Sequence, residues 1–453
     1  MDLVMYTLRN VAGAIITPPL VFILITLAVV LYLKNKKIVT MQKLILGGSV
    51  NSAVELTLSQ LVLGILGGAI GSLILTSLGV VFSLNSGISY LFLISIILMF
   101  IKPRLICFTY SGAILGGLSI LIKIASEFAP TAINNQILNV DVLYLMIFVG
   151  VSHIIEGILV MIDGDRGAVP IFTNRDGKIL GGYALKRYWL LPLAIMLAVS
   201  VDNSSINYIT EYIENPNWWP LIKSTSGLNL IASSVISIVP FYAILGYSAI
   251  TFTRSKREKA VSSGIHILIY GIVLTFVAQI ARFGIWGEIV VIGFAPFAHE
   301  FMLKIQTKSE KKREPKFVSD EEGLIVLEVS PNSQVKEFGI NIESKLLSIN
   351  DKNINSEAEA YSIIKENLNN AVLKVKDSKG IIKDIEFRHN RNTRLGMLLV
   401  PRSVDKEEIV PIEDSSFKSV FDTIRNSENN KYDKPTNDKF NQDNKEENKS
   451  KKL

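Results

Sequence analysis

The chain has 453 residues, 49% of them hydrophobic and 19% charged, with a formal net charge of +6. Its mean hydropathy of +0.35 excludes an ordinary soluble protein, because most of the charge lies in the last third of the chain. The basic residues cluster at the ends of apolar segments, where they set membrane orientation, so the positive charge does not indicate nucleic-acid binding.

Residues 1–303 form the apolar part and predict a multi-span membrane domain of about eight or nine helices. An α-helix needs about 20 apolar residues to cross roughly 30 Å of hydrocarbon. Pro18 and Pro19 should kink the first span, because each lacks a backbone donor. The candidate spans are residues 11–33, 61–82, 88–101, 105–122, 142–162, 188–201, 228–250, 261–280 and 285–303, of which the third, sixth and ninth are weakest.

Flanking charge predicts the orientation of these spans. Basic turns alternate with neutral or acidic loops, and cytoplasmic loops are the ones enriched in Lys and Arg. We therefore expect an outside N-terminus and a cytoplasmic C-terminal part. The basic turns lie at residues 34–37, 102–104, 166–187 and 254–259 and from residue 304 onward.

The basic loop 163–187 contains Asp176-Gly177 between apolar residues, the pattern of a tight β-hairpin turn. The simple interpretation is a small hairpin at the membrane surface, and the alternative is a partner site. Cys107, the single cysteine, excludes an internal disulfide and is expected to be a membrane-buried side chain rather than a reactive thiol.

After a basic linker at residues 304–318, residues 319–402 change to short strands with alternating apolar residues. Strands are expected at residues 324–329, 345–349, 371–376, 381–387 and 395–400. A short helix is expected within residues 330–338, and a second helix follows the capping residue Ser356.

This stretch resembles a PDZ domain in the runs GLIVLEVSPNS at residues 323–333 and FGINIESKLLSIND at residues 338–351. Glu343-Ser344 replaces the usual Gly-Asp, and the candidate carboxylate-binding loop RLGML lies at residues 394–398, as in permuted bacterial PDZ domains. The resemblance implies a groove that accepts a peptide as an added strand. Its lining would be Leu395, Gly396, Met397 and Leu398, with Tyr361 and Ile364 facing it from the second helix. The alternative is a module that packs on a partner through another face.

Residues 403–453 are rich in Asn, Lys, Asp, Glu and Ser, which predicts a disordered tail. Within residues 416–426, four apolar residues recur at helical spacing and predict a short amphipathic helix that docks a partner or the membrane: Phe417, Val420, Phe421 and Ile424. The simple alternative is a brief apolar stretch without a role.

Enzymatic readings find little support. An intramembrane zinc protease needs two histidines one helical turn apart with a glutamate between them. His299-Glu300 begins such a motif, but Leu303 occupies the position of the second histidine. His153 and Glu156 fit the reversed motif, but Gly157 occupies the position of its second histidine. A two-histidine site assembled across helices is conceivable but has little support in the sequence. Phosphate-loop and nucleophile-elbow motifs are missing. We expect no catalysis, cofactor or metal. A transporter is the other membrane class considered, since His153, Glu156 and Glu288 could line a path.

The layout also resembles the MinJ family of division-site topological determinants, in HIIEGILVMIDGDRGAVPIF at residues 153–172 and GYALKRYW at residues 182–189. The resemblance implies a polytopic α-helical membrane domain plus a small α/β PDZ-like domain, a partly open β-barrel with two helices. It implies an adaptor in the cytoplasmic membrane, concentrated at septa and poles, that links DivIVA to MinC and MinD. The alternative is a PDZ-bearing regulator of a protease or of an envelope process.

Overall fold

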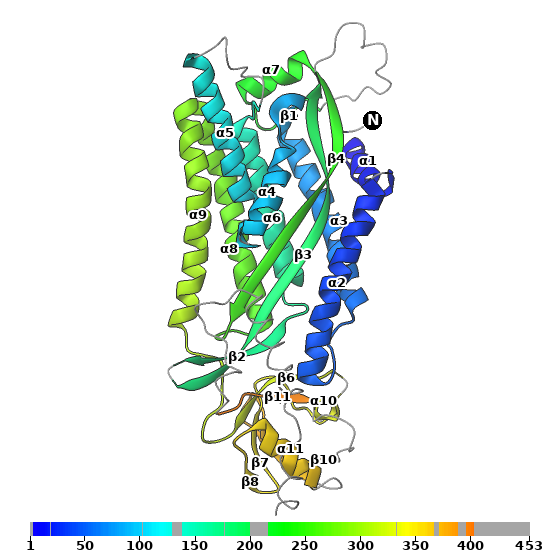
Figure 1. Ribbon diagram of the computed structural model, residues 1–453, viewed down its shortest axis with the longest axis vertical. Coiled ribbons are helices and arrows are strands. Elements are labelled where there is room, and N and C mark those ends of the chain that lie inside the picture. Colours follow the sequence, from blue (N-terminus) through cyan, green and yellow to red (C-terminus); the bar gives the residue numbers. More distant parts are fainter. Residues whose placement is uncertain are drawn as a thin grey trace, which may run out of the picture.

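The computed structural model describes residues 3–18, 20–101, 103–128, 138–175, 177–199, 216–331, 333–366, 371–387 and 396–402. In Figure 1 the long helices and a long β-hairpin lie side by side in the upper part, and a smaller sheet domain lies below them. The helices of the upper part are α1 (Leu3–Ile16), α2 (Leu20–Leu46), α3 (Ala53–Leu78), α4 (Tyr90–Ile101), α5 (Phe108–Phe128), α6 (Val142–Asp163), α7 (Thr225–Ser233), α8 (Lys256–Val277) and α9 (Ile285–Lys312).

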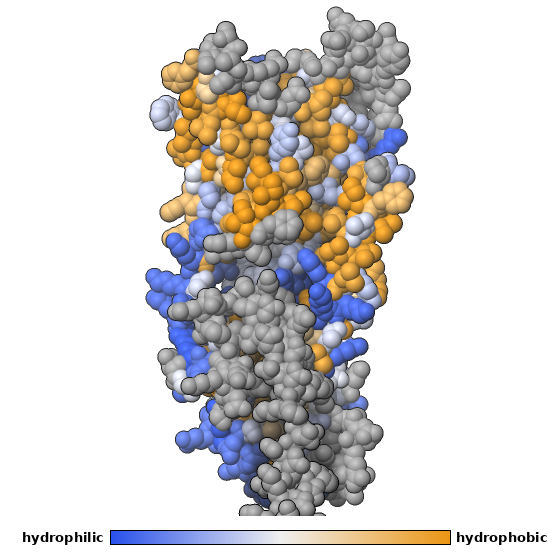
Figure 2. Space-filling view, viewed as in Figure 1, coloured by the Kyte–Doolittle hydropathy of each residue, from blue (hydrophilic) through white to orange (hydrophobic). Residues whose placement is uncertain are grey.

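Within the described residues, four helices are long and apolar enough to cross a membrane: α3, α5, α6 and α8 with its 3-10 extension to Phe283. A fifth span arises if α1 and α2, which meet at a 66° bend beside Pro18, count as one broken span. The described part of the chain thus has the features of a multi-pass membrane protein. In Figure 2 the surface of the upper part is largely apolar, and hydrophilic residues are visible beneath it on both sides of the molecule.

Two expected helical spans are strands instead. Residues 188–201 lie largely in β3 (Lys178–Val199), and residues 228–250 begin in α7 and continue in β4 (Val235–Thr251). β3 and β4 pair antiparallel from Tyr183 opposite Thr251 to Val199 opposite Val235. Pro192 and Pro240 explain why neither segment is a continuous helix, since proline breaks a helix interior. Hydropathy alone cannot distinguish a buried strand from a helix.

The second edge of the middle of β3 lies against helix α3, so the helix covers a strand edge that would otherwise face an apolar environment. A Cβ atom on Gly64 would come within 2.1 Å of the Leu190 carbonyl oxygen, and one on Gly68 within 2.2 Å of the Pro192 oxygen. The hydroxyl of Ser72 accepts the backbone N–H of Ala194 at 2.8 Å. The missing N–H of Pro192 faces α3 as well, so it removes no bond to β4.

Helices α6 and α8 also pack backbone to backbone through glycine. A Cβ atom on Gly157 would lie 2.7 Å from the Gly264 oxygen, and one on Gly271 would lie 2.6 Å from the Gly150 oxygen. Small residues at such crossings are typical of membrane helices, because they allow close approach. This crossing fixes the relative position of the side chains that α6 and α8 carry.

The β-hairpin predicted within residues 163–187 is confirmed. β2 (Val169–Arg175) and β3 pair antiparallel with Arg175 opposite Lys178, which leaves a two-residue turn, and Gly177 has φ of +79°. The short strand β1 (Val81–Ser83) pairs with the far end of β3, and β5 (Phe317–Val318) pairs with Leu180 and Gly181. Of the predicted linker, residues 304–312 therefore belong to α9, and its last two residues join the sheet of the membrane part.

The C-terminal sheet domain is a six-stranded antiparallel sheet in the order β10-β9-β7-β6-β11, with β8 paired to β7. Five of its strands lie where the sequence predicts them, and the two-residue strand β8 is an addition to the prediction. The elements are β6 (Leu324–Val329), α10 (Gln334–Glu337), β7 (Lys345–Ile349), β8 (Lys352–Asn353), α11 (Glu357–Glu366), β9 (Ala371–Lys376), β10 (Ile382–Phe387) and β11 (Met397–Leu399). Asn350 and Asp351 have φ of +49° and +59° and form the tight turn from β7 to β8.

Candidate functional site

The predicted groove residues lie around the edge strand β11. Among the described strands, β11 pairs only with β6, so it ends that side of the sheet. Met397 belongs to the core of the sheet domain together with Ile364 of α11, and Tyr361 packs against this core from the same helix. Gly396 has φ of +76°, which favours glycine, and its carbonyl accepts the N–H of Ser330 at 2.7 Å.

Leu398 faces the other way. It is 4% exposed and lies with Leu327 and Val400 in the hydrophobic core that continues into the membrane part. Adjacent strand residues point to opposite faces, so Met397 serves the sheet domain and Leu398 serves its attachment. Leu395, Phe417, Val420, Phe421 and Ile424 lie outside the described residues.

The attachment of the sheet domain combines apolar and polar contacts. Phe317 is fully buried beside the ring of Tyr183, with ring centroids 5.6 Å apart, and the Tyr183 hydroxyl donates to the Leu327 carbonyl. Lys256 Nζ lies 2.6 Å from Glu328 Oε2. The sheet domain is therefore held against the membrane part at several points.

Lys316 forms a second polar connection. Its ammonium lies 2.9 Å from Glu343 of the sheet domain and 3.2 Å from Glu258 at the start of α8. Burial lowers the pKa of Lys316, but its hydrogen bonds with these two carboxylates outweigh burial and raise the pKa above its ordinary value. The lysine thus stays charged and bridges both parts at neutral pH.

A fully buried ion pair joins the hairpin to the helices. Arg187 of β3 and Asp163 at the end of α6 are each 0% exposed, and Arg187 Nε donates to Asp163 Oδ2 at 2.9 Å. Arg187 also donates to the Ser59 hydroxyl of α3 at 2.6 Å, and the Trp189 indole donates to Asp163 Oδ2 at 3.0 Å. Charge counting assigns Arg187 to a basic surface turn, whereas the structure gives it a structural role.

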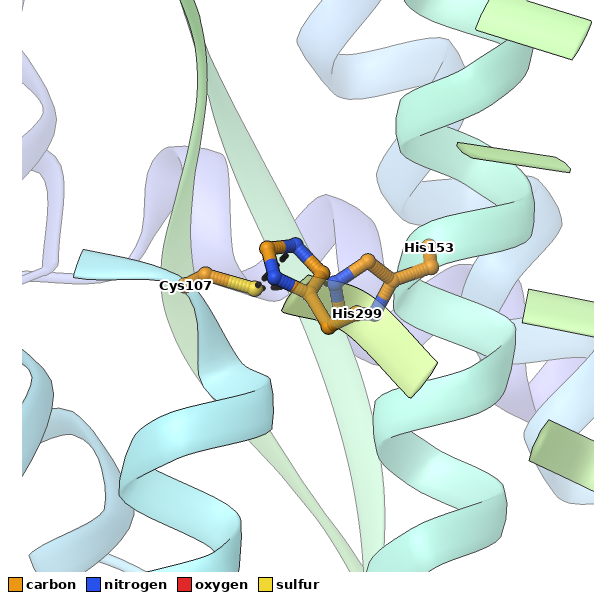
Figure 3. A group of neighbouring side chains, drawn as sticks. All are labelled: Cys107, His153 and His299. Carbon is orange, nitrogen blue, oxygen red and sulfur yellow. Dashed lines mark hydrogen bonds between the residues drawn. The ribbon is translucent and has the colours of Figure 1, made fainter. Parts of the chain in front are cut away.

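Figure 3 shows a second cluster, in the interior of the helical part. Cys107 precedes α5, His153 lies on α6 and His299 lies on α9, and their ligand atoms all lie within 4.8 Å of one another. A thiol and two imidazoles placed in this way could hold a metal ion. Because 46 and 192 residues separate Cys107 from the two histidines, their convergence follows only from the fold. His266 lies elsewhere on α8, and His389 is outside the described residues.

A scan against protein-family models, a search of curated proteins and a search of solved structures each found no match.

Proposed function

We propose that this protein is a multi-pass membrane adaptor that presents its C-terminal sheet domain to soluble partners. The observation that carries the proposal is the attachment of the domain. Strand β5 continues the sheet of the membrane part, and Tyr183, Lys256 and Lys316 tie the domain to it. A module on a flexible tether would need none of these contacts. A fixed module displays its binding edge in a defined direction relative to the membrane.

The binding edge that we propose is β11 beside α11. An extended peptide adds to an exposed edge strand through main-chain hydrogen bonds, and side-chain pockets give specificity. Gly396 supplies a backbone conformation that an L side chain rarely adopts, as expected of a loop that turns N–H groups toward a ligand. The occupant is the C-terminal segment of a partner protein, as the PDZ resemblance implies.

The orientation that we propose places the sheet domain in the cytoplasm. Basic residues gather toward this end, with Lys34 and Lys186 near Tyr188 and Lys256 at the start of α8. Basic flanks favour the cytoplasmic side of a membrane. By resemblance to the MinJ family, the partners are DivIVA, MinC and MinD, and the location is the cytoplasmic membrane at septa and poles.

The test is a crosslinked pull-down with the full-length protein in membranes. Tyr361→Ala should reduce partner recovery at least about tenfold, because aromatic side chains carry much of the energy of an interface. Ser362→Ala, an exposed neighbour on α11, is the matched control and should leave recovery unchanged.

Localisation gives an independent readout. A fluorescent fusion of the full-length protein should concentrate at septa and poles, and its deletion should produce filaments or misplaced septa. Uniform membrane fluorescence with normal division, together with equal recovery by the Tyr361→Ala and control proteins, would refute the adaptor proposal. Saturable solute uptake by vesicles would support a transporter instead.

A further inference from the structure

Three side chains from separate parts of the chain converge inside the helical part. Cys107 Sγ lies 2.9 Å from His153 Nε2 and 3.6 Å from His299 Nε2. Both imidazoles are largely buried, at 2% and 8% exposure. Figure 3 shows the thiol pointing toward the two rings. A sulfur and two imidazole nitrogens form a donor set that transition metals prefer.

The remaining contacts orient both rings for this purpose. His153 Nδ1 lies 2.7 Å from the Val149 carbonyl, which only accepts hydrogen bonds, so Nδ1 carries the proton. His299 Nδ1 lies 3.2 Å from the Tyr110 hydroxyl, which donates its own hydrogen to Glu300. Nδ1 of His299 is therefore also the donor. Each Nε2 keeps a lone pair, and both lone pairs face Cys107.

These hydrogen bonds of Nδ1 are what metal-binding histidines require, because a hydrogen bond at the nitrogen that does not bind the metal fixes the tautomer and the ring orientation. Two carboxyl groups lie nearby as well. Glu156 Oε2 is 4.0 Å from His153 Nε2, and Glu300 is connected to His299 through Tyr110. A divalent ion bound to one thiolate has a net charge of about +1, which these carboxylates compensate in an apolar interior.

We propose that Cys107 Sγ, His153 Nε2 and His299 Nε2 bind a divalent transition metal ion of the zinc class. The thiol releases its proton to solvent on binding, because the thiolate is the ligand. Three protein ligands leave a fourth coordination position for water or for Glu156. The ion connects the residue before α5 with α6 and α9, so it also stabilises the helical part. The alternative is a hydrogen-bonded cluster without an ion, in which Thr109 Oγ1, 3.2 Å from His153 Nε2, serves that ring.

The first experiment measures metal content. Full-length protein in detergent micelles is incubated with Zn²⁺ and passed over a chelating resin. The zinc that remains bound per chain is then measured by elemental mass spectrometry. Wild type should retain about one ion per chain. Cys107→Ser and His299→Gln should retain at least about tenfold less, as expected when a ligand is lost. His266→Gln is the matched control, because His266 bonds the Ser262 carbonyl in the same way as His153 bonds Val149 but lies outside the cluster.

The second experiment uses Co²⁺ and tests ligand identity in the wild-type protein. Co²⁺ bound through a thiolate gives a sulfur-to-cobalt charge-transfer band in the near ultraviolet, and this band should vanish in Cys107→Ser. If a variant does not fold, the rate of alkylation of Cys107 in the wild-type protein, with and without Zn²⁺, tests the proposal instead. Zn²⁺ should slow alkylation at least about tenfold, and a chelator should restore the rate. A wild-type protein that retains no ion, shows no charge-transfer band and is alkylated equally fast with and without Zn²⁺ would overturn the proposal.

Discussion

Replacing Arg187 with Met should destabilise the protein more than any nearby change of a surface charge. The substitution leaves the Asp163 carboxylate fully buried without its main cation. The Trp189 indole and Arg166 still approach the carboxylate, Arg166 at 3.5 Å. Breaking a buried ion pair by removing one partner typically costs about 3–5 kcal/mol. We expect a loss of this size in the free energy of unfolding, and the same for Asp163→Leu.

The double variant separates pairing from burial. Arg187→Met combined with Asp163→Leu removes both charges, so its cost should fall well below the sum of the single costs, with a coupling of about 2–3 kcal/mol. Arg166→Met is the control, because the Arg166 side chain is 49% exposed and exposed pairs contribute about 1 kcal/mol or less.

The assay is equilibrium unfolding of the full-length protein in mixed micelles, followed by circular dichroism. If Arg187→Met were no more costly than Arg166→Met, or if the two single costs were simply additive, the buried pair would not connect the hairpin to the helices as described.

Three further predictions concern packing, attachment and pH. Gly68→Val should lower the free energy of unfolding by at least about 2 kcal/mol, because the new Cβ would meet the backbone of Pro192. Gly117→Val is the control, because a Cβ there has open space and should be well tolerated. The yields of folded protein of the two variants are compared. Leu398→Asp places a charge in the attachment core and should release the sheet domain to limited proteolysis, while Val372→Asp, at a position 39% exposed, should not. Burial raises the pKa of Asp320, but the hydrogen bond and charge of Lys345 together with backbone N–H donors such as that of Gly323 outweigh burial and lower this pKa. The hydrogen bond from the Ile381 N–H likewise lowers the pKa of Asp377. A carboxyl group with a lowered folded pKa stabilises the fold above its unfolded pKa and loses this as the pH falls, so the melting temperature should drop below about pH 4; an unchanged melting temperature at pH 3 would contradict the assignment.

The sequence predicts the sheet domain better than the membrane part. The strands of the sheet domain show alternating apolar residues, and Asp176-Gly177 marks the β2–β3 turn, so local pattern is enough in both places. The β3–β4 hairpin is not predictable in this way, since both strands are as continuously apolar as a membrane helix, β3 being buried along most of its length and β4 partly buried. Pro192 and Pro240 are the signal that could have revealed it.

The clusters formed by distant residues are beyond local pattern altogether. Arg187 has the sequence context of a surface turn, and only the fold places it against Asp163 and Ser59. Cys107 shows the same limit, because neither histidine near it is close in sequence. The structure describes part of the predicted groove, including Gly396 and Met397, and the peptide that would occupy it stays a prediction.

The most direct test of the adaptor proposal is the side of the membrane on which the sheet domain lies. Lys379→Cys, in the turn before β10, can be labelled with a membrane-impermeant maleimide, with the wild-type protein as the blank for Cys107. We predict labelling only after the membrane is opened. Labelling of intact cells at the same rate as opened membranes would contradict the proposal.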